Sequence, residues 1–74
     1  IFENKFDIIF IDPPYKEKNL PLLLDGIITA DILNDGGIII IHRHKKEKDT
    51  FHEKFKIVED KTYGISRVLF GSYL

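Results

Sequence analysis

The sequence feature that most constrains the fold is an uninterrupted apolar run, Ile8–Ile11, which ends abruptly in Asp-Pro-Pro-Tyr at positions 12–15. A strand that is apolar on both faces is typical of a parallel sheet covered by helices on both sides. In such sheets, ligands bind just beyond the carboxyl ends of the strands. We therefore expect Asp12 to lie where the chemistry of the protein takes place.

The two prolines restrict what this loop can offer a ligand. Each disfavours the helical conformation in the residue before it, so Asp12 and Pro13 are expected to be extended. Neither Pro13 nor Pro14 has an N–H, so the loop provides acceptors, the Asp12 carboxylate and the Pro13 carbonyl, and few donors. With the flat ring of Tyr15 beside it, such a pocket suits a base that carries an exocyclic amino group. A plainer interpretation is a rigid turn in which Tyr15 only packs.

Length and composition bound the class of protein. A chain of 74 residues forms one domain at most, and its start at Ile-Phe-Glu, without methionine, suggests part of a longer protein. The net charge of −1 gives no global basic field, although lysines cluster at positions 45, 46 and 48 and at 54, 56 and 61. Cysteine is absent, which excludes disulfides and thiolate metal sites. With no apolar run of membrane-spanning length and no signal peptide, we expect a soluble, cytoplasmic protein.

A helix of about twelve residues is predicted after the loop, from the 3.6-residue spacing of its apolar positions. Pro21 suits the first turn, with Asn19 or Leu20 at the cap. The stop is expected at Asn-Asp-Gly-Gly, positions 34–37, where glycine can take the left-handed conformation. The stripe that should pack on the sheet consists of Leu23, Leu24, Ile27, Ile28 and Ile32.

A second apolar run, Ile38–Ile41, predicts another buried parallel strand and hence a right-handed β-α-β crossover. His42 and His44 follow it and would share one face of the strand. They could contribute to a metal site, but no carboxylate joins them at suitable spacing, so a solvated or RNA-facing strand end is favoured.

The last third of the chain predicts an antiparallel hairpin. Residues 55–59 and 67–70 are strand-like, and the segment between them, positions 60–66, is short and contains Gly64. A parallel crossover followed by a terminal hairpin is an α/β arrangement.

Two motifs carry a family resemblance. Asp12-Pro13-Pro14-Tyr15 after an apolar strand resembles motif IV (Asp/Asn/Ser-Pro-Pro-aromatic) of the amino-directed, S-adenosylmethionine-dependent methyltransferases. The terminal run from Glu59 to Phe70, Glu-Asp-Lys-Thr-Tyr-Gly-Ile-Ser-Arg-Val-Leu-Phe, is similar to that of the RsmD family, which methylates guanine N2 in bacterial 16S rRNA. The resemblance implies a Rossmann-like class I methyltransferase fold, of which residues 1–74 are the carboxyl-terminal portion of a single domain.

The resemblance also implies a site. Asp12, Pro13, Pro14 and Tyr15 would be catalytic, with Asp12 also a partial contact to the cofactor, S-adenosylmethionine; Lys16, Arg43, Lys45 and Lys46 would bind RNA. The partner would be ribosomal RNA in the small ribosomal subunit. The family's glycine-rich cofactor loop would lie upstream of Ile1, so the 74 residues alone are expected to be inactive. They are also expected to self-associate through an exposed strand 7–11.

Two other functions stay open at this point. An adenine or cytosine amino-methyltransferase of DNA or RNA shares the Asp-Pro-Pro-Tyr motif. A non-catalytic remnant that binds RNA or a protein partner would also retain this fold, and the lysine clusters could equally be a solvated face.

Overall fold

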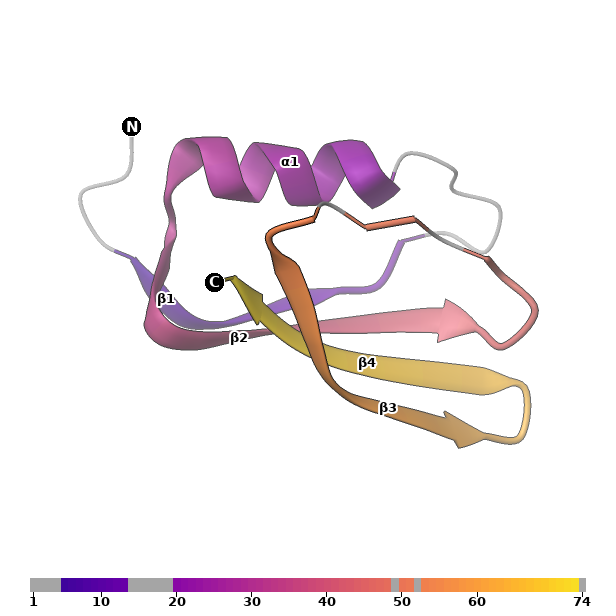
Figure 1. The fold of residues 1–74 in the computed structure, drawn as a ribbon. Coiled ribbons are helices and arrows are strands. Elements are labelled where there is room, and N and C mark those ends of the chain that lie inside the picture. The colour runs from indigo at the N-terminus through magenta and orange to yellow at the C-terminus, as the bar shows by residue number, and fades with distance from the viewer. Residues whose placement is uncertain (1–4, 14–19, 49, 52, 74) are drawn as a thin grey trace.

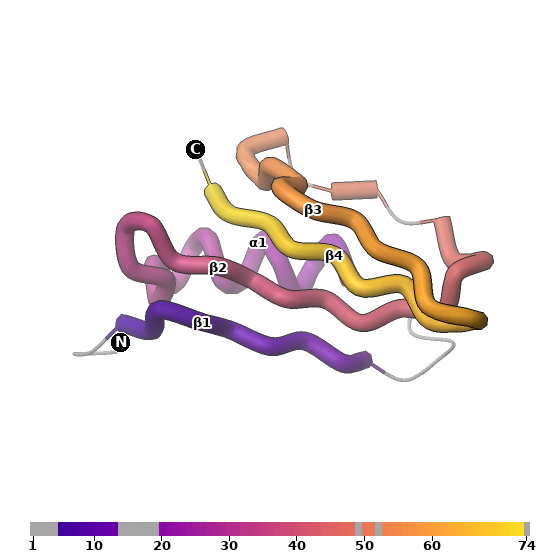
Figure 2. Tube along the Cα trace, turned by 90° about the horizontal axis from the view of Figure 1, so that it is seen from below, coloured from indigo at the N-terminus to yellow at the C-terminus, as the bar shows by residue number. Residues whose placement is uncertain are grey.

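The structure, a computed structural model, describes residues 5–13, 20–48, 50–51 and 53–73. Strand β1 spans Phe6–Ile11, helix α1 Leu20–Ala30, strand β2 Leu33–His44, strand β3 Phe55–Tyr63 and strand β4 Ser66–Tyr73. The four strands form one sheet in the order β1-β2-β4-β3 (Figure 2). β1 and β2 are parallel, while β4 is antiparallel to both β2 and β3. This confirms the predicted α/β order, a parallel crossover followed by a terminal hairpin.

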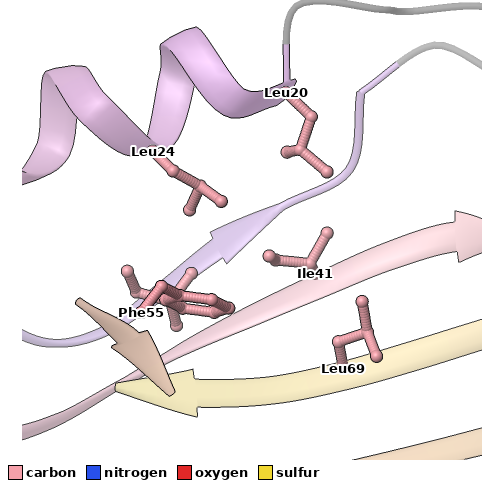
Figure 3. Packing of buried hydrophobic residues seen from close by; sticks show 6 residues of the cluster. Leu20, Leu24, Ile41, Phe55 and Leu69 are labelled. Carbon is pink, nitrogen blue, oxygen red and sulfur yellow. The ribbon is translucent and has the colours of Figure 1, made fainter. Parts of the chain in front are cut away.

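One face of the sheet is covered by α1 (Figure 1). The core consists of Leu20 and Leu24 from the helix and of Ile39, Ile41, Phe55 and Leu69 from three of the strands. Figure 3 shows the two leucines pointing down from the helix onto the strand residues. Fully burying each of these side chains contributes about 1.5–3 kcal/mol, so this small cluster is the main force holding helix and sheet together.

The helix ends earlier than the sequence suggested. Asp31 adopts a positive φ of 52°, and its N–H donates to the carbonyls of Ile27 and Ile28, both at 3.1 Å. Aspartate is one of the few non-glycine residues that accept the left-handed conformation, so Asp31 is the C-terminal cap. The predicted stop at positions 34–37 is wrong, because these residues already belong to β2. Leu23, which was expected in the apolar stripe, is exposed.

The start of β2 is irregular. Between the pairs Phe6–Leu33 and Ile8–Ile38, β1 advances by two residues and β2 by five. Gly37 makes this bulge possible, since a Cβ there would lie 2.6 Å from Leu33 Cδ1 and 2.8 Å from the carbonyl oxygen of Asn34. From Ile38 onward, the two strands pair in regular register.

The other face of the sheet is open. Ile8 and Phe10 of β1 are 64% and 62% exposed, and Ile38 of β2 is also exposed. The expectation that both apolar strands are buried on both faces is therefore wrong for the residues described, because α1 covers only one side and no described element crosses the other (Figure 2). No helix in this part of the chain is long and apolar enough to cross a membrane.

Candidate active site at the carboxyl ends of β1 and β2

The two parallel strands turn polar at the same level of the sheet. Ile11 pairs with Ile41, so the next residues, Asp12 and His42, follow side by side. Alternation along a strand puts both side chains on the open face, in line with Ile8, Phe10 and Ile38. The chemistry-bearing residues of β1 and β2 thus meet at the carboxyl edge, where an open α/β sheet binds its ligands.

Asp12 and His42 are hydrogen-bonded. Asp12 Oδ1 lies 2.9 Å from His42 Nδ1, and the side chains are 58% and 39% exposed. An ionised carboxylate can only accept, so the bond requires a proton on Nδ1, which leaves Nε2 as an acceptor whenever the ring is neutral. Asp12 Oδ2 accepts no hydrogen bond from the residues described, and it remains able to accept one from a ligand.

A cavity of about 200 Å³ opens beside this pair. It is lined by Asp12, Pro13, His42, Arg43, His44, Ile65 and Ser66, which come from the ends of β1 and β2 and from the β3–β4 turn. Pro13 is half-buried and lines the edge of this cavity. Pro14, Tyr15 and Lys16, which the sequence also assigned to the site, lie outside the described residues.

A larger hollow, of about 470 Å³, lies at the opposite end of the sheet. The end of α1, the bulge at the start of β2, Lys54 and Tyr73 line it. It faces the amino end of β2, away from the edge where parallel strands place their ligand-binding loops. We therefore place the candidate site at the smaller cavity.

The two histidines of β2 use Nδ1 in different hydrogen bonds, His42 with a carboxylate and His44 with a backbone N–H. His44 lies on the same face as His42, but its Nδ1 accepts a hydrogen bond from the backbone N–H of Lys46 at 3.1 Å. The backbone N–H of Lys45 in turn donates to the carbonyl of Ile65 at 2.8 Å, which ties the turn after β2 to the hairpin tip. These contacts build one wall of the cavity and leave the side chains of Lys45 and Lys46 exposed.

Arg43 differs from the exposed RNA contact that the sequence suggested. It is only 4% exposed, because it points to the helix-covered face with Ile39 and Ile41. Its Nη2 lies 3.6 Å from Glu47 Oε2. A buried guanidinium with its own carboxylate is a structural pair, so we leave Arg43 out of any RNA-binding surface.

Arg67, the neighbour of Arg43 across the β2–β4 ladder, has its own carboxylate as well. Its Nε and Nη2 donate to the two carboxylate oxygens of Asp60 at 2.9 and 2.6 Å. These hydrogen bonds hold the pKa of the Asp60 carboxyl below its usual value. Each arginine is thus neutralised locally, and the two can lie side by side near the cavity.

His42 is the partner of Asp12 that sequence reasoning missed. The signal was present, since the strand pairing aligns two isoleucine-rich runs whose next residues are Asp12 and His42. What the sequence could not provide was the register, because the loop and helix between the strands do not fix it. Among the residues described, no group of three or more histidine, aspartate or glutamate side chains could hold a metal ion.

Comparisons with known proteins find relatives that are named as methylases. The family model described as "Conserved hypothetical protein 95" matches residues 2–72. The Uncharacterized methylase RP545 of Rickettsia prowazekii (strain Madrid E) is 34% identical over 68 residues, which cover 92% of the chain and 29% of the relative. The chain therefore spans less than a third of the length of that curated relative.

Three solved structures share the fold. A conserved hypothetical protein of Streptococcus pyogenes matches with a TM-score of 0.81 and 23% identity, over 92% of this chain and 43% of its own. The candidate methylase HI0767 of Haemophilus influenzae matches with a TM-score of 0.80 and 20% identity, over 99% of this chain and 46% of its own. The candidate methyltransferase yhhF of Escherichia coli matches with a TM-score of 0.76 and 17% identity, over 95% of this chain and 38% of its own. These likenesses confirm the predicted Rossmann-like methyltransferase fold, of which the chain forms a part.

Proposed function

Because the chain belongs to the family described as "Conserved hypothetical protein 95", the RsmD-type methylases, we propose that it carries the target-base half of a methyl-transfer site. The proposed substrate is the exocyclic amino group of a guanine in small-subunit ribosomal RNA. The observation that carries the proposal is the position of Asp12, which follows the carboxyl end of β1, lines the cavity and has an Oδ2 that accepts no hydrogen bond from the residues described.

The acceptors at this edge match the chemical need of the reaction. The amino group of a nucleobase is a poor nucleophile, because its lone pair is delocalised into the ring. Asp12 Oδ2 and the Pro13 carbonyl could each accept one of its two hydrogens, which would turn the nitrogen lone pair toward the incoming methyl group. Their contribution is positioning, together with stabilisation of the positive charge that develops on nitrogen.

S-adenosylmethionine, when bound, would supply the methyl group as an electrophilic sulfonium. The chain offers the acceptors for the target base, but the residues described contain no glycine-rich turn that opens a helix, and Gly36 and Gly37 lie within β2. We therefore propose that these residues hold the target nucleobase and not the body of the cofactor. The nitrogen gains the methyl group and afterwards releases a proton, so Asp12 does not need to act as a base before the transfer.

Contacts to the RNA follow from the surface near the cavity. Lys45 and Lys46 are exposed on the turn beside it and can meet phosphate groups. Lys16, which the sequence places next to Tyr15, is proposed for the same role. Lysine–phosphate contacts position a nucleic acid without reading its sequence, so the choice of guanine falls to the cavity.

The test is methyl transfer by the complete protein, as its gene encodes it. Labelled S-adenosylmethionine is supplied with small ribosomal subunits, free ribosomal RNA or double-stranded DNA, and the modified nucleoside is identified after digestion. We expect label in N2-methylguanosine of small-subunit RNA. Label in N6-methyladenine or N4-methylcytosine would instead support the related amino-methyltransferases, and RNA binding without any transfer would support a non-catalytic remnant.

Asp12→Ala tests the residue that carries the proposal. The rate of methyl transfer should fall by about 10²–10³-fold, the usual cost of removing one preorganised polar group from a reacting centre. Affinity for S-adenosylmethionine, measured by calorimetry, should change little. Asp35→Ala, at the opposite end of the sheet, is the matched control, and near-normal turnover in Asp12→Ala would remove Asp12 from the mechanism.

A further inference from the structure

The Asp12–His42 bond has a direction that matters for the proposed reaction. His42 Nδ1 lies 2.9 Å from Oδ1 of Asp12. Because an ionised carboxylate only accepts, Nδ1 is the donor, and the bond occupies one of the two carboxylate oxygens. A free aspartate side chain rotates about two bonds, and a carboxylate that is 58% exposed has few contacts to prevent this. Among the residues described, the bond to His42 is the hydrogen bond that holds this carboxylate.

We propose that His42 is a positioning residue, which holds Oδ1 of Asp12 so that Oδ2 stays directed at the amino group of the target base. This inference rests on the proposed methyl transfer and adds a residue to it. His42 does not touch the reacting atoms; it acts through Asp12. The role needs only the proton on Nδ1 and is filled whether Nε2 carries a proton or not.

The fold supplies the means of this positioning. His42 is held by its place in the β2 ladder, where it pairs with Val68 of β4, and the register Ile11–Ile41 brings it beside Asp12. Asp12 itself lies just past the end of β1, outside the regular ladder. The side chain of His42, on a strand paired on both sides, therefore fixes the orientation of the Asp12 side chain, which follows the end of β1.

His44 cannot take over this role. Its Nδ1 is an acceptor for the N–H of Lys46, so the corresponding nitrogen carries no proton to offer a carboxylate. It also lies two residues further along β2, past the level of Asp12. The assignment is thus specific to His42.

Substitution of His42 by asparagine and by leucine separates the effect of the Nδ1 donor from that of the rest of the imidazole ring. The amide nitrogen of asparagine occupies nearly the position of histidine Nδ1, so His42→Asn keeps a donor toward Asp12 and removes Nε2. His42→Leu removes both. In the complete protein we expect His42→Leu to lower kcat by about 10- to 100-fold, the usual effect of losing an orienting partner, and His42→Asn to restore most of it.

A double-mutant cycle shows whether the effect passes through Asp12. In an Asp12→Ala background, His42→Leu should cost less than about twofold, because no carboxylate remains to be oriented. Thermal melts of each variant establish that the fold is retained. An equal cost in both backgrounds, or an Asn variant as poor as the Leu variant, would overturn the positioning role.

A second readout does not depend on activity. In ¹⁵N-labelled complete protein, the ring nitrogens of His42 should report the Nδ1–H form at neutral pH, and Asp12→Ala should shift the Nδ1 signal. A ring protonated only at Nε2 would overturn the pairing itself. A protein in which His42 pairs with Asp12 but no nucleic acid is methylated would instead refute the proposed function, so the two failures are distinguishable.

Discussion

The ring of Phe55 on β3 lies so close to Gly71 on β4 that a side chain at position 71 would force the ring or the backbone of β3 to move. A Cβ there would lie 2.7 Å from Cε1 of the Phe55 ring and 2.9 Å from the carbonyl oxygen of Lys56. The same ring meets Tyr73 edge-on, with centroids 5.7 Å apart, and Phe51 at 5.4 Å. Phe55 thereby joins the outer strand to the core under α1 (Figure 3).

Gly71→Ala is predicted to destabilise the protein. The added methyl group must displace the Phe55 ring or the backbone of β3, and overpacking of this kind costs about 1–3 kcal/mol. The free energy of unfolding, obtained from denaturant titration, measures it. Gly26→Ala is the matched control, because a Cβ at Gly26 meets nothing within 4 Å and alanine favours the helix by about 0.5–1 kcal/mol. Equal stability of Gly71→Ala and wild type would contradict the packing described.

Tyr73 is predicted to make stability fall at alkaline pH. Burial, with a smaller contribution from the charge of Asp25, raises the pKa of Tyr73 from 10.0 to about 12. Since the folded state holds this proton more tightly, the stabilisation is complete below pH 10 and is lost as the pH rises toward 12. The Tyr73 hydroxyl also donates to the carbonyl of Leu24 at 2.9 Å, a bond worth about 0.5–1.5 kcal/mol.

Tyr73→Phe should therefore be less stable than wild type at neutral pH, and the difference should shrink between pH 10 and 12. Unfolding titrations at a series of pH values measure the difference, and tyrosinate absorbance follows the ionisation directly. Tyr63→Phe, at an exposed tyrosine at the end of β3, should change the stability by less than about 0.5 kcal/mol. A difference that widens with alkaline pH would show that the hydroxyl is not held as described.

Tyr15 is predicted to act through its ring. Stacking on a base that has left its helix or loop is worth about 1–3 kcal/mol and does not need the hydroxyl. In the complete protein, Tyr15→Phe should be mild and Tyr15→Ala severe in methyl transfer. If phenylalanine were as damaging as alanine, the hydroxyl would be the working group.

The 74-residue chain by itself is predicted to associate. β1 pairs with β2 on one side, and no described strand pairs with its other edge, which is a template for a second copy. Sedimentation should show dimers or larger species, and the double substitution Ile8→Lys with Phe10→Lys should reduce them. Leu22→Lys, a similarly exposed position on α1, serves as the control. A monomer that bound S-adenosylmethionine tightly would contradict both this prediction and the proposal that these residues hold the target base and not the body of the cofactor.

The order and type of the elements could be predicted, because each has a strong local signal. The runs Ile8–Ile11 and Ile38–Ile41 are short and uniformly apolar, as strands of a parallel sheet are, and Pro21 marks the helix start. The boundaries could not be predicted to the same degree. The pair Gly36 and Gly37 looked like a helix stop, but in the structure it forms a bulge, while Asp31, with no special sequence signal, is the cap.

The site was predictable on one strand and not on its neighbour. Asp12 was identified from the motif that follows β1, whereas the roles of His42 and Arg43 depend on which face each occupies. In the sequence, His-Arg-His reads as a uniformly polar strand end. Only the three-dimensional alternation reveals that the arginine is inside, with Glu47, and that the first histidine is outside, with Asp12.

The isoleucine run of β2 contains no information about its own register. If β2 slipped by one residue, isoleucine would replace isoleucine at Ile39, Ile40 and Ile41, and the core would be filled almost as before. The slip would, however, move the guanidinium of Arg43 to the open face and the imidazole of His42 beneath α1, away from Asp12. The bulge at positions 34–37 precedes the regular register of β1 and β2, so an insertion or deletion there that shifted β2 by one residue would separate His42 from Asp12 while leaving an isoleucine-filled core.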